Sequence, residues 1–371
     1  MGSCGCKIIF TEAEAHPEDF RPKENVQITN NSLNIIQCSS NELLKFKQKF
    51  DKQKLPEIGE YITQEEFNSS IKDDIKEYLK KNLLEIPDAY TIKIKTYPLD
   101  PIKYKNGNIY FGNWNECYEM EGYGKFYLLS KDILIEGIWR QGKLVYGKIF
   151  YKSGERYIGE ISDSEPHGKG QYYSINGEKY EGDFFRGQKS GIGKFSYGDG
   201  TTYEGEVKNG LFQGKGKIKW EKRTMEYTGH FNGSALDGYG ILINEVGDRY
   251  EGNFKKNNFN GNGVYKYKNG DVYKGEYENG VMKGKGLFIR SDGFCFEGEF
   301  DNDFPNGRGK IVFSNNFLEV KCKNGVMMDD EEKIVDGHRE DFGNIFLNIT
   351  PEKPFICNGI LPHLIYSDTD I

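Results

Sequence analysis

The stretch DGTTYEGEVKNGLFQGKGKI, residues 199–218, combines a Tyr-Glu-Gly at Tyr203 with a Gly-Lys-Gly that begins at Gly214. Glycine next to lysine is typical of loops that bind phosphate, because bare backbone N–H groups and an ammonium can converge on an anion. The same glycine motif recurs along the chain, however, at a spacing of 23 residues with a single 24. Its second glycine falls at Gly124, Gly147, Gly170, Gly193, Gly216, Gly240, Gly263, Gly286 and Gly309. The motif is therefore a repeat and not a single phosphate site.

The tyrosine half of the motif follows the same period. Its tyrosines are Tyr110, Tyr157, Tyr180, Tyr203, Tyr227, Tyr250 and Tyr273, while Ile135 and Phe296 stand at the two other positions. Nine units therefore extend from about residue 108 to residue 316. A fixed period in this range is typical of stacked supersecondary units that bury their apolar faces against their neighbours.

Apolar and polar residues alternate within one unit. Tyr180, Gly182 and Phe184 alternate with Glu181 and Asp183, and a period of two indicates a strand. Turn residues separate the strands, so each unit is predicted to be a β-hairpin with a tight connection to the next. The predicted fold class is all-β: an elongated, single-layer antiparallel β-meander with a short N-terminal α-helical segment. Nine hairpins give about eighteen strands and, at about 4.8 Å per strand, a sheet roughly 85 to 90 Å long.

Residues 180–195, YEGDFFRGQKSGIGKF, resemble one copy of the MORN repeat (membrane occupation and recognition nexus), whose pattern is close to Y-x-G-x-F-x-x-G-x-x-x-G-x-G-x-aromatic. The resemblance extends over nine tandem copies of about 23 residues. It implies a protein that works at the cell cortex, in cilia or at membrane junctions, and phosphoinositide binding has been proposed for the family. We expect the repeat glycines to be structural, namely Gly159, Gly170, Gly182, Gly193, Gly205, Gly216, Gly229, Gly240, Gly252, Gly263, Gly275 and Gly286.

The composition divides the chain into four regions. We expect an extended arm at 1–40, a helical N-terminal cap at 41–88, the repeat array at 89–328, and an acidic linker with a C-terminal tail at 329–371. Apolar residues at helical spacing predict one amphipathic helix from Thr63 to Leu84, which begins with a capping box of Thr63 and Glu66. This helix is expected to cover the first strands, with partner binding as the alternative. Apolar groups at 345–347 and 355–356 predict that the tail docks on its own array or on another chain.

Aromatic residues gather on one face of the predicted sheet. They are Tyr157, Tyr180, Phe184, Tyr203, Tyr227, Phe231, Tyr250, Phe254, Tyr273 and Phe300. A single-layer sheet cannot bury that face alone, so we expect some rings to pack on their neighbours and the others to line an exposed groove. Such a groove would bind a protein partner as a helix, an extended peptide or a second array, which includes a homodimer.

Charged residues occupy the opposite face. Lys125, Lys148, Lys194, Lys217 and Lys310 share one repeat position, and Glu181, Glu204, Glu206, Glu251, Glu276 and Glu299 lie on the adjoining strands. Opposite charges that face each other across strands favour a solvated ladder. Phosphoinositide binding by the lysines is the alternative that the resemblance offers.

No feature of the sequence predicts an enzyme. The stretch GKLVYGKI at 142–149 fits G-x-x-x-x-G-K but has Ile149 where a phosphate loop needs Ser or Thr to hold magnesium. The five histidines are isolated from one another, and no C-x-x-C pair suggests zinc. We therefore expect no catalytic residue, no metal and no cofactor. A net charge of −7 also disfavours nucleic acid as a partner.

The N-terminal sequence MGSCGC resembles a dual-acylation signal, with myristate on Gly2 and palmitate on Cys4 and Cys6. Two acyl chains anchor a protein stably to a membrane, whereas one chain binds only marginally. No stretch is apolar enough to act as a membrane span or a secretion signal, so we expect a cytoplasmic protein at a membrane, cilium, basal body or cell cortex. The sequence thus predicts a non-enzymatic scaffold that links protein partners to a membrane or to the cytoskeleton. A soluble axonemal subunit without lipid contact and a phosphoinositide-sensing module remain the alternatives.

Overall fold

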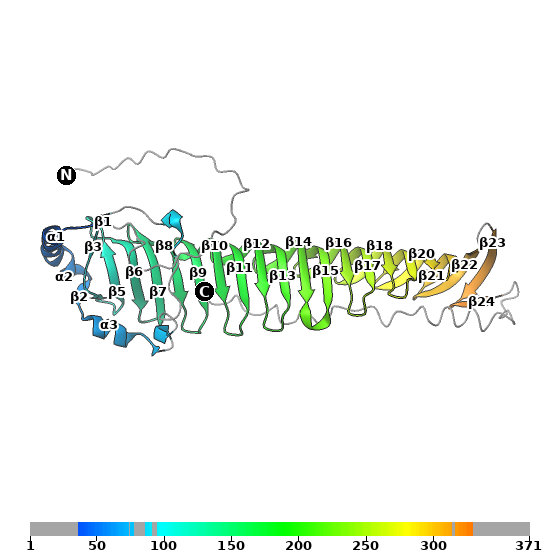
Figure 1. Ribbon diagram of the computed structural model, residues 1–371, viewed down its shortest axis with the longest axis horizontal. Helices are drawn as coiled ribbons and strands as arrows, with labels where there is room; N and C mark the ends of the chain where they lie inside the picture. The colour runs from blue at the N-terminus through cyan, green and yellow to red at the C-terminus, as the bar shows by residue number, and fades with distance from the viewer. Residues whose placement is uncertain (1–35, 74, 78–85, 91–94, 314–315, 329–371) are drawn as a thin grey trace, which may run out of the picture.

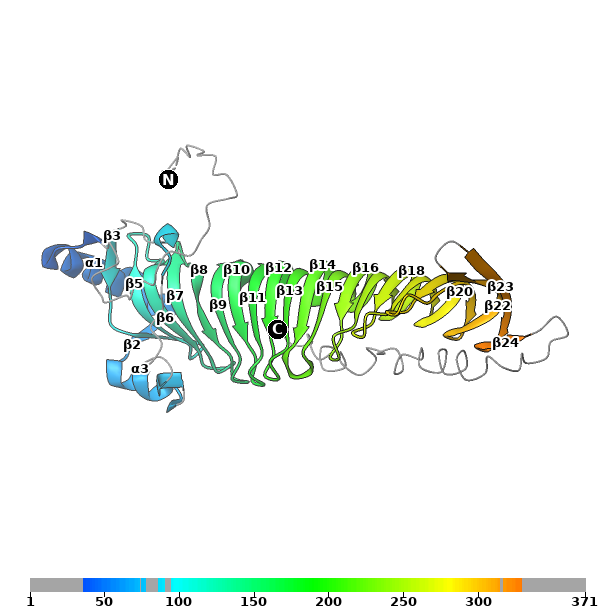
Figure 2. The same ribbon diagram turned by 45° about the vertical axis from the view of Figure 1, so that its right-hand side comes forward.

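The computed structural model describes residues 36–73, 75–77, 86–90, 95–313 and 316–328. Within these residues a single sheet of 24 strands runs the length of the molecule. The helices lie at one end of the sheet, and β23 and β24 lie at the other (Figures 1 and 2). Consecutive strands pair antiparallel from β5 onward, which confirms the predicted elongated meander.

Nine hairpins form the body of the sheet, one for each predicted unit. Their strands are β5 (Ile109–Trp114), β6 (Met120–Leu128), β7 (Ile133–Arg140), β8 (Lys143–Phe150), β9 (Arg156–Ser162), β10 (Glu165–Tyr173), β11 (Lys179–Phe185), β12 (Gln188–Ser196), β13 (Thr202–Lys208), β14 (Leu211–Trp220), β15 (Met225–Asn232), β16 (Ala235–Ile243), β17 (Arg249–Lys255), β18 (Asn258–Lys266), β19 (Val272–Glu278), β20 (Val281–Ile289), β21 (Cys295–Asp301) and β22 (Phe304–Phe313). Two further strands, β23 (Asn316–Lys323) and β24 (Val326–Met328), extend the sheet at its C-terminal end.

Short strands and helices close the N-terminal end. The strands β1 (Ile36–Gln37), β2 (Gly59–Tyr61), β3 (Lys95–Pro98) and β4 (Ile102–Tyr104) add to the sheet beside β5. The helices are α1 (Ser40–Gln53), α2 (Leu55–Ile58) and α3 (Gln64–Ser70). In α1, which was not predicted as a separate helix, Phe46 and Phe50 are buried and contact Tyr97 and Trp114.

The prediction of one continuous helix from Thr63 to Leu84 is wrong. The capping box of Thr63 and Glu66 is present, but α3 ends at Ser70 because Ile71 has an extended backbone. The Ser69 and Ser70 hydroxyls both donate to the Glu66 carbonyl, at 2.9 and 2.8 Å, and such bonds compete with the helical ladder. Residue 74 and residues 78–84 of the predicted helix lie outside the described part of the chain.

A bulge bends each hairpin. In the pairing of β11 with β12, Gly182 faces Gly193 but Phe184 faces Lys189, so the register shifts between the two pairs. A bulge bends the strand and increases its twist. The shift recurs in every repeat hairpin, and the part of the strand beyond the bulge therefore folds over the part before it. We call the side inside this bend, which carries Tyr180, the inner face, and the side with Glu181 the outer face.

Candidate functional site

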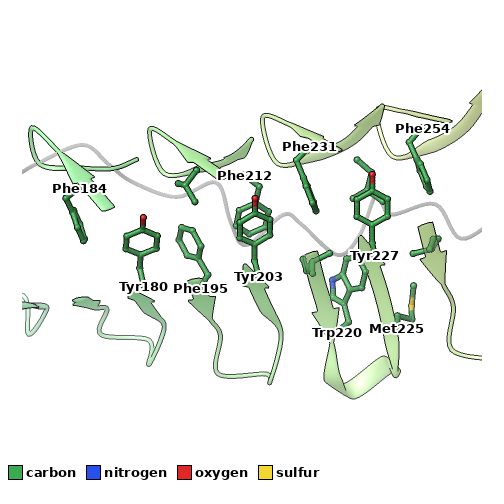
Figure 3. Close-up of a cluster of buried hydrophobic side chains, with 14 of the residues drawn as sticks. Tyr180, Phe184, Phe195, Tyr203, Phe212, Trp220, Met225, Tyr227, Phe231 and Phe254 are labelled. Atoms are coloured by element: carbon green, nitrogen blue, oxygen red, sulfur yellow. The ribbon is translucent and has the colours of Figure 1, made fainter. Parts of the chain in front are cut away.

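The inner face holds the ten aromatic residues that were predicted to line a partner groove. All ten are buried, namely Tyr157, Tyr180, Phe184, Tyr203, Tyr227, Phe231, Tyr250, Phe254, Tyr273 and Phe300. Figure 3 shows the rings of Tyr180, Tyr203 and Tyr227 between their own strands and the segments that carry Phe184, Phe231 and Phe254. The prediction that part of these rings lines an exposed groove is therefore wrong. The sheet buries its aromatic face without a second layer, because each hairpin folds over its own rings at the bulge.

Each repeat tyrosine lies over two glycines of adjacent strands. A Cβ atom on Gly193 would come within 2.3 Å of Tyr180 Cε2, and a Cβ atom on Gly182 within 2.5 Å of Gly193 Cα. The same close approach recurs at Gly159 and Gly170, Gly205 and Gly216, Gly229 and Gly240, Gly252 and Gly263, and Gly275 and Gly286. The glycines therefore leave the space that the ring fills.

The tyrosine hydroxyls bond to the backbone at the bulge. Tyr180 Oη donates to the carbonyl oxygen of Asp183 at 2.9 Å, and Tyr203 Oη donates to that of Glu206 at 2.6 Å. The tyrosines at 110, 157, 227, 250 and 273 make the same bond to the residue three positions on. Burial raises the pKa of Tyr180 and Tyr203 above the ordinary value, because a buried phenolate would lose its hydration. These rings belong to the core and are closed to a partner.

The outer face carries the predicted charge ladder. Glu181, Lys194, Glu204 and Lys217 are consecutive partners across β11 to β14. Lys217 Nζ lies 2.6 Å from a carboxylate oxygen of Glu226 on the next strand. The predicted ladder of opposite charges is therefore confirmed over these strands, and each lysine in it has carboxylates beside it.

Two of the predicted ladder residues have another role. Glu206 accepts a hydrogen bond from the backbone N–H of Lys215 at 2.8 Å, and Glu276 accepts one from the N–H of Lys285 at 3.4 Å. Both carboxylates lie at a bulge and outside the row that contains Lys194 and Lys217. They lie on the outer face as predicted, but the residues opposite them are Ile192 and Asn262 and not lysines.

The N-terminal end of the outer face is covered by the chain itself. Phe67 of α3, with Ile71 and Ile75, packs on Ile109, Tyr127, Leu134 and Phe150 of β5 to β8. Closer to the middle of that face, Ile86 packs on Ile138. The expectation that an N-terminal helix covers the first strands is therefore confirmed for α3.

The C-terminal half of the outer face is hollowed into a groove, which we call the outer groove. Its volume is about 1540 Å³, and it extends from Tyr239 on β16 to Met328 on β24. Tyr239 is 52% exposed and Leu318 is 50% exposed. Its apolar lining on the outer face consists of Tyr239, Val264, Leu287 and Met328, while Leu318, Val320 and Met327, which pair with inner-face residues, border it at the end of the array. Several apolar side chains of the sheet thus gather in one groove, whereas exposed ones elsewhere, such as Ile192, stand outside it.

Charged side chains surround the apolar lining of the outer groove. Six are basic and four are acidic, namely Lys266, Lys274, Lys285, Arg308, Lys310 and Lys321 against Glu251, Glu297, Glu299 and Glu319. The Tyr239 hydroxyl donates to Glu251 at 2.7 Å, and Arg249 lies 2.6 Å from the same carboxylate. These two contacts hold the pKa of Glu251 below its ordinary value, so the carboxylate is ionised at neutral pH. The groove is amphipathic with a small excess of positive charge.

Sequence reasoning missed the outer groove, although the sequence carries a signal for it. The residue after the second repeat glycine is lysine in five units, as at Lys194 and Lys217. In three consecutive units the same position holds Ile241, Val264 and Leu287. Aliphatic residues at three neighbouring outer positions make an apolar stripe where the other units place charge, and two of the three line the groove.

The structure gives no support to the phosphate-loop alternative. Within GKLVYGKI, residues 143–149 belong to β8, a strand between β7 and β9. A phosphate loop lies instead between a strand and a helix, with its N–H groups turned to the anion. Within the described residues, no group of three or more His, Cys, Asp or Glu side chains is placed to hold a metal ion.

No helix in the described part of the chain is long and apolar enough to cross a membrane. The predicted lipidation residues Gly2, Cys4 and Cys6 lie outside the described residues, as does the C-terminal tail at 329–371.

Solved structures with a detectable likeness include two TCP domains. One is the TCP10 domain of Danio rerio CPAP with a peptide of STIL, at 12% identity and a TM-score of 0.35, covering 58% of this chain and 93% of that chain. The other is the TCP domain of Drosophila melanogaster SAS-4 with a proline-rich motif of Ana2, at 14% identity and a TM-score of 0.29, covering 41% and 83%. At such TM-scores the likeness carries no argument about this chain.

Among curated proteins, none matches the sequence. The MORN repeat family model matches at six positions, residues 157–179, 180–202, 203–225, 250–272, 273–294 and 296–316. The other three hairpins share the same strand pairing without a match to the model. The chain therefore carries MORN repeats at these six positions, and the tyrosine-over-glycine packing recurs in five of them.

Proposed function

We propose that the protein is a non-catalytic scaffold that binds a protein partner in the outer groove. The single observation that carries this proposal is the position of the accessible apolar side chains. The inner face is closed, the N-terminal outer face is covered by α3, and Tyr239 is exposed and Val264 and Leu287 are partly exposed in a groove of about 1540 Å³. A concave surface with an apolar floor and a charged rim is typical of a binding site for a protein segment.

The chemistry of the outer groove defines the segment that fits it. The apolar lining runs across the strands from β16 to β24, so an elongated segment would lie along the axis of the array. The lining favours aliphatic or aromatic side chains, and the excess of Lys and Arg over Glu favours acidic flanks. A helix or an extended peptide with two apolar clusters and a negative net charge meets these requirements.

Photo-crosslinking in cells tests this proposal. A photoreactive side chain placed at Val264 or Leu287 would cross-link the partner, because both residues line the groove. The matched control is Ile192, which is 56% exposed on the outer face of β12 and lies outside the groove. Cross-links to one protein from the two groove positions, absent at Ile192, are the expected result. Equal cross-linking from all three positions would overturn the proposed site.

The proposal includes a membrane tether at the N-terminus. Its basis is the sequence, where Gly2, Cys4 and Cys6 stand as in a dual-acylation signal. Replacing Gly2→Ala, or Cys4→Ser with Cys6→Ser, should release the protein from membranes in fractionation experiments and leave partner binding intact. If these variants stay membrane-bound, the tether is not acylation. A cytoplasmic scaffold at a membrane, the cell cortex or a cilium follows from this arrangement.

The two alternatives make different predictions about lipid. Lys194 and Lys217 stand beside Glu181 and Glu204 on the outer face, and this interleaving weakens attraction to anionic headgroups. A phosphoinositide sensor would bind phosphoinositide vesicles after removal of residues 1–10, whereas the tethered scaffold would not. An unmodified N-terminus in the native protein would favour a soluble axonemal subunit.

A further inference from the structure

We infer that the chain's own C-terminal tail, residues 329–371, occupies the outer groove until a partner segment displaces it. The docking of the tail is independent of the proposed function, whereas its role as a competitor rests on that function. The occupant is a segment of the same molecule, so binding at the groove would be regulated from within the chain. Three features of the molecule carry this inference.

The first feature is that the chain itself covers an apolar part of the outer face at the N-terminal end of the array. There the apolar residues Tyr127, Leu134 and Phe150 are covered by the chain's own flanking segment, through Phe67 and Ile71. The second apolar stretch of the outer face begins with Tyr239, includes Val264 and Leu287, and ends with Met328 at the end of the array. A flanking segment follows directly after that end, and it is the tail.

The second feature is reach. The last described residues, Met327 and Met328, themselves line the outer groove, so the tail leaves the array inside the site. The groove crosses nine strands, β16 to β24, which at about 4.8 Å per strand is roughly 40 Å. The 43 residues from 329 to 371 span up to about 140 Å when extended, so even a partly folded tail reaches the far end.

The third feature is complementary chemistry. The tail holds ten Asp and Glu residues against three Lys and Arg residues, and the groove holds six basic residues against four acidic ones. The tail also carries apolar clusters, Ile345-Phe346-Leu347 and Phe355-Ile356, which suit the lining at Val264 and Leu287. An acidic segment with two apolar clusters is the type of ligand that the groove favours.

Cross-linking of the purified full chain tests the docking. A photoreactive side chain at Val264 should give links to peptides of 329–371, and the same group at Ile192 should not. An equal mixture of unlabelled and nitrogen-15-labelled chains shows which molecule provides the tail. Links within one chain support the inference, whereas mixed links would assign the groove to a second copy and overturn it. Absence of any link between Val264 and the tail would also overturn it.

Two variants of the tail test the competition. Phe346→Asp with Leu347→Asp lies outside the array, so it removes the apolar cluster without touching the core. Cross-linking from Val264 to the tail should fall, and partner capture should rise about tenfold, because a tethered competitor acts at a high effective concentration. The matched control is Ser367→Asp with Thr369→Asp, which adds the same charge and should change neither. Unchanged partner capture with lost tail links would overturn the regulatory role.

The failures of the two proposals are distinguishable. If tail links form at Val264 but the partner cross-links equally from Ile192, the tail docks and the proposed partner site is wrong. If the partner cross-links from Val264 and Leu287 while no tail link forms, the partner site stands and the docking inference is wrong.

Discussion

The two faces of this sheet are built from the same strands but follow different rules. On the inner face, seven of the nine units repeat one contact, in which a tyrosine lies over two glycines and is bonded to the backbone at the bulge. On the outer face, the side chains differ from one unit to the next, from a ladder of charges at β11 to β14 to an apolar groove at β16 to β24. The comparison teaches that the repeat pattern encodes the fold, whereas the departures from it on the outer face form the groove that we propose as the binding site.

The largest expected effect is a loss of stability at alkaline pH, which arises from the buried tyrosines of the inner face. Burial raises the pKa of Tyr110, Tyr157, Tyr203 and Tyr250 above the value in the unfolded chain, which is about 10. Their contribution to stability is therefore complete below about pH 10 and is lost as the pH rises above it, by up to about 1.4 kcal/mol per tyrosine and pH unit. We expect cooperative unfolding above pH 10 in circular dichroism, together with a rise in phenolate absorbance. Full phenolate absorbance from a folded array would contradict the closed inner face.

A second effect concerns the covered end of the outer face. Phe67 is 1% exposed in the contact between α3 and β5 to β8, so Phe67→Ala should cost about 3 to 5 kcal/mol of local stability. Hydrogen exchange of α3 measures this cost. The control Ile192→Ala, at an exposed site on the same face, should change stability by less than about 0.5 kcal/mol. Equal effects of the two variants would mean that α3 is not a cover.

Gly193→Val tests the space under the ring. The new Cβ atom would lie 2.3 Å from Tyr180 Cε2, so the ring must move, at a cost of about 1 to 3 kcal/mol in urea denaturation. Gly198→Val is a suitable control, because the nearest atom to its Cβ is a backbone oxygen at 3.7 Å. An unchanged denaturation midpoint for Gly193→Val would count against the packing described for the inner face.

The smallest effect isolates one hydrogen bond. Tyr203→Phe keeps the ring, which stacks on Phe212 at a centroid distance of 3.7 Å, and removes the bond to the Glu206 carbonyl. The free energy of unfolding should fall by about 1 kcal/mol. The unit with Phe296 already lacks this hydroxyl, so Phe296→Leu serves as a comparison that alters the ring alone. Equal stability of the Tyr203→Phe variant and the wild type would exclude a role for the hydroxyl.

The sequence was sufficient to predict the hairpins, because a period of 23 residues with internal alternation has one simple structural solution. It was insufficient for the burial of Tyr180 and Tyr203, because the bulge leaves the alternation of Gly182, Asp183 and Phe184 intact while it shifts the pairing. The end of α3 was missed because the hydroxyls of Ser69 and Ser70 bond to a carbonyl, which helical spacing does not reveal.

The outer groove was missed for a different reason. The predicted site followed the residues that recur from repeat to repeat. Ile241, Val264 and Leu287 are exceptions, because they stand at the position where five other units have lysine. The prediction placed the binding surface on the recurring aromatic residues of the inner face, which are buried. The proposed partner site consists of exceptions to the pattern, and the three-dimensional arrangement is needed to recognise them as one surface.

Partner capture by the double variant Val264→Lys with Leu287→Lys tests the central claim most directly. Lysine stands at the same position in five sister units, so the fold should tolerate it and the denaturation midpoint should match that of the wild type. The account predicts that this variant loses the partner that is cross-linked from the groove, whereas Ile192→Lys keeps it. A folded double variant that captures the partner as well as the wild type would contradict the claim that the outer face of β16 to β24 is the functional surface.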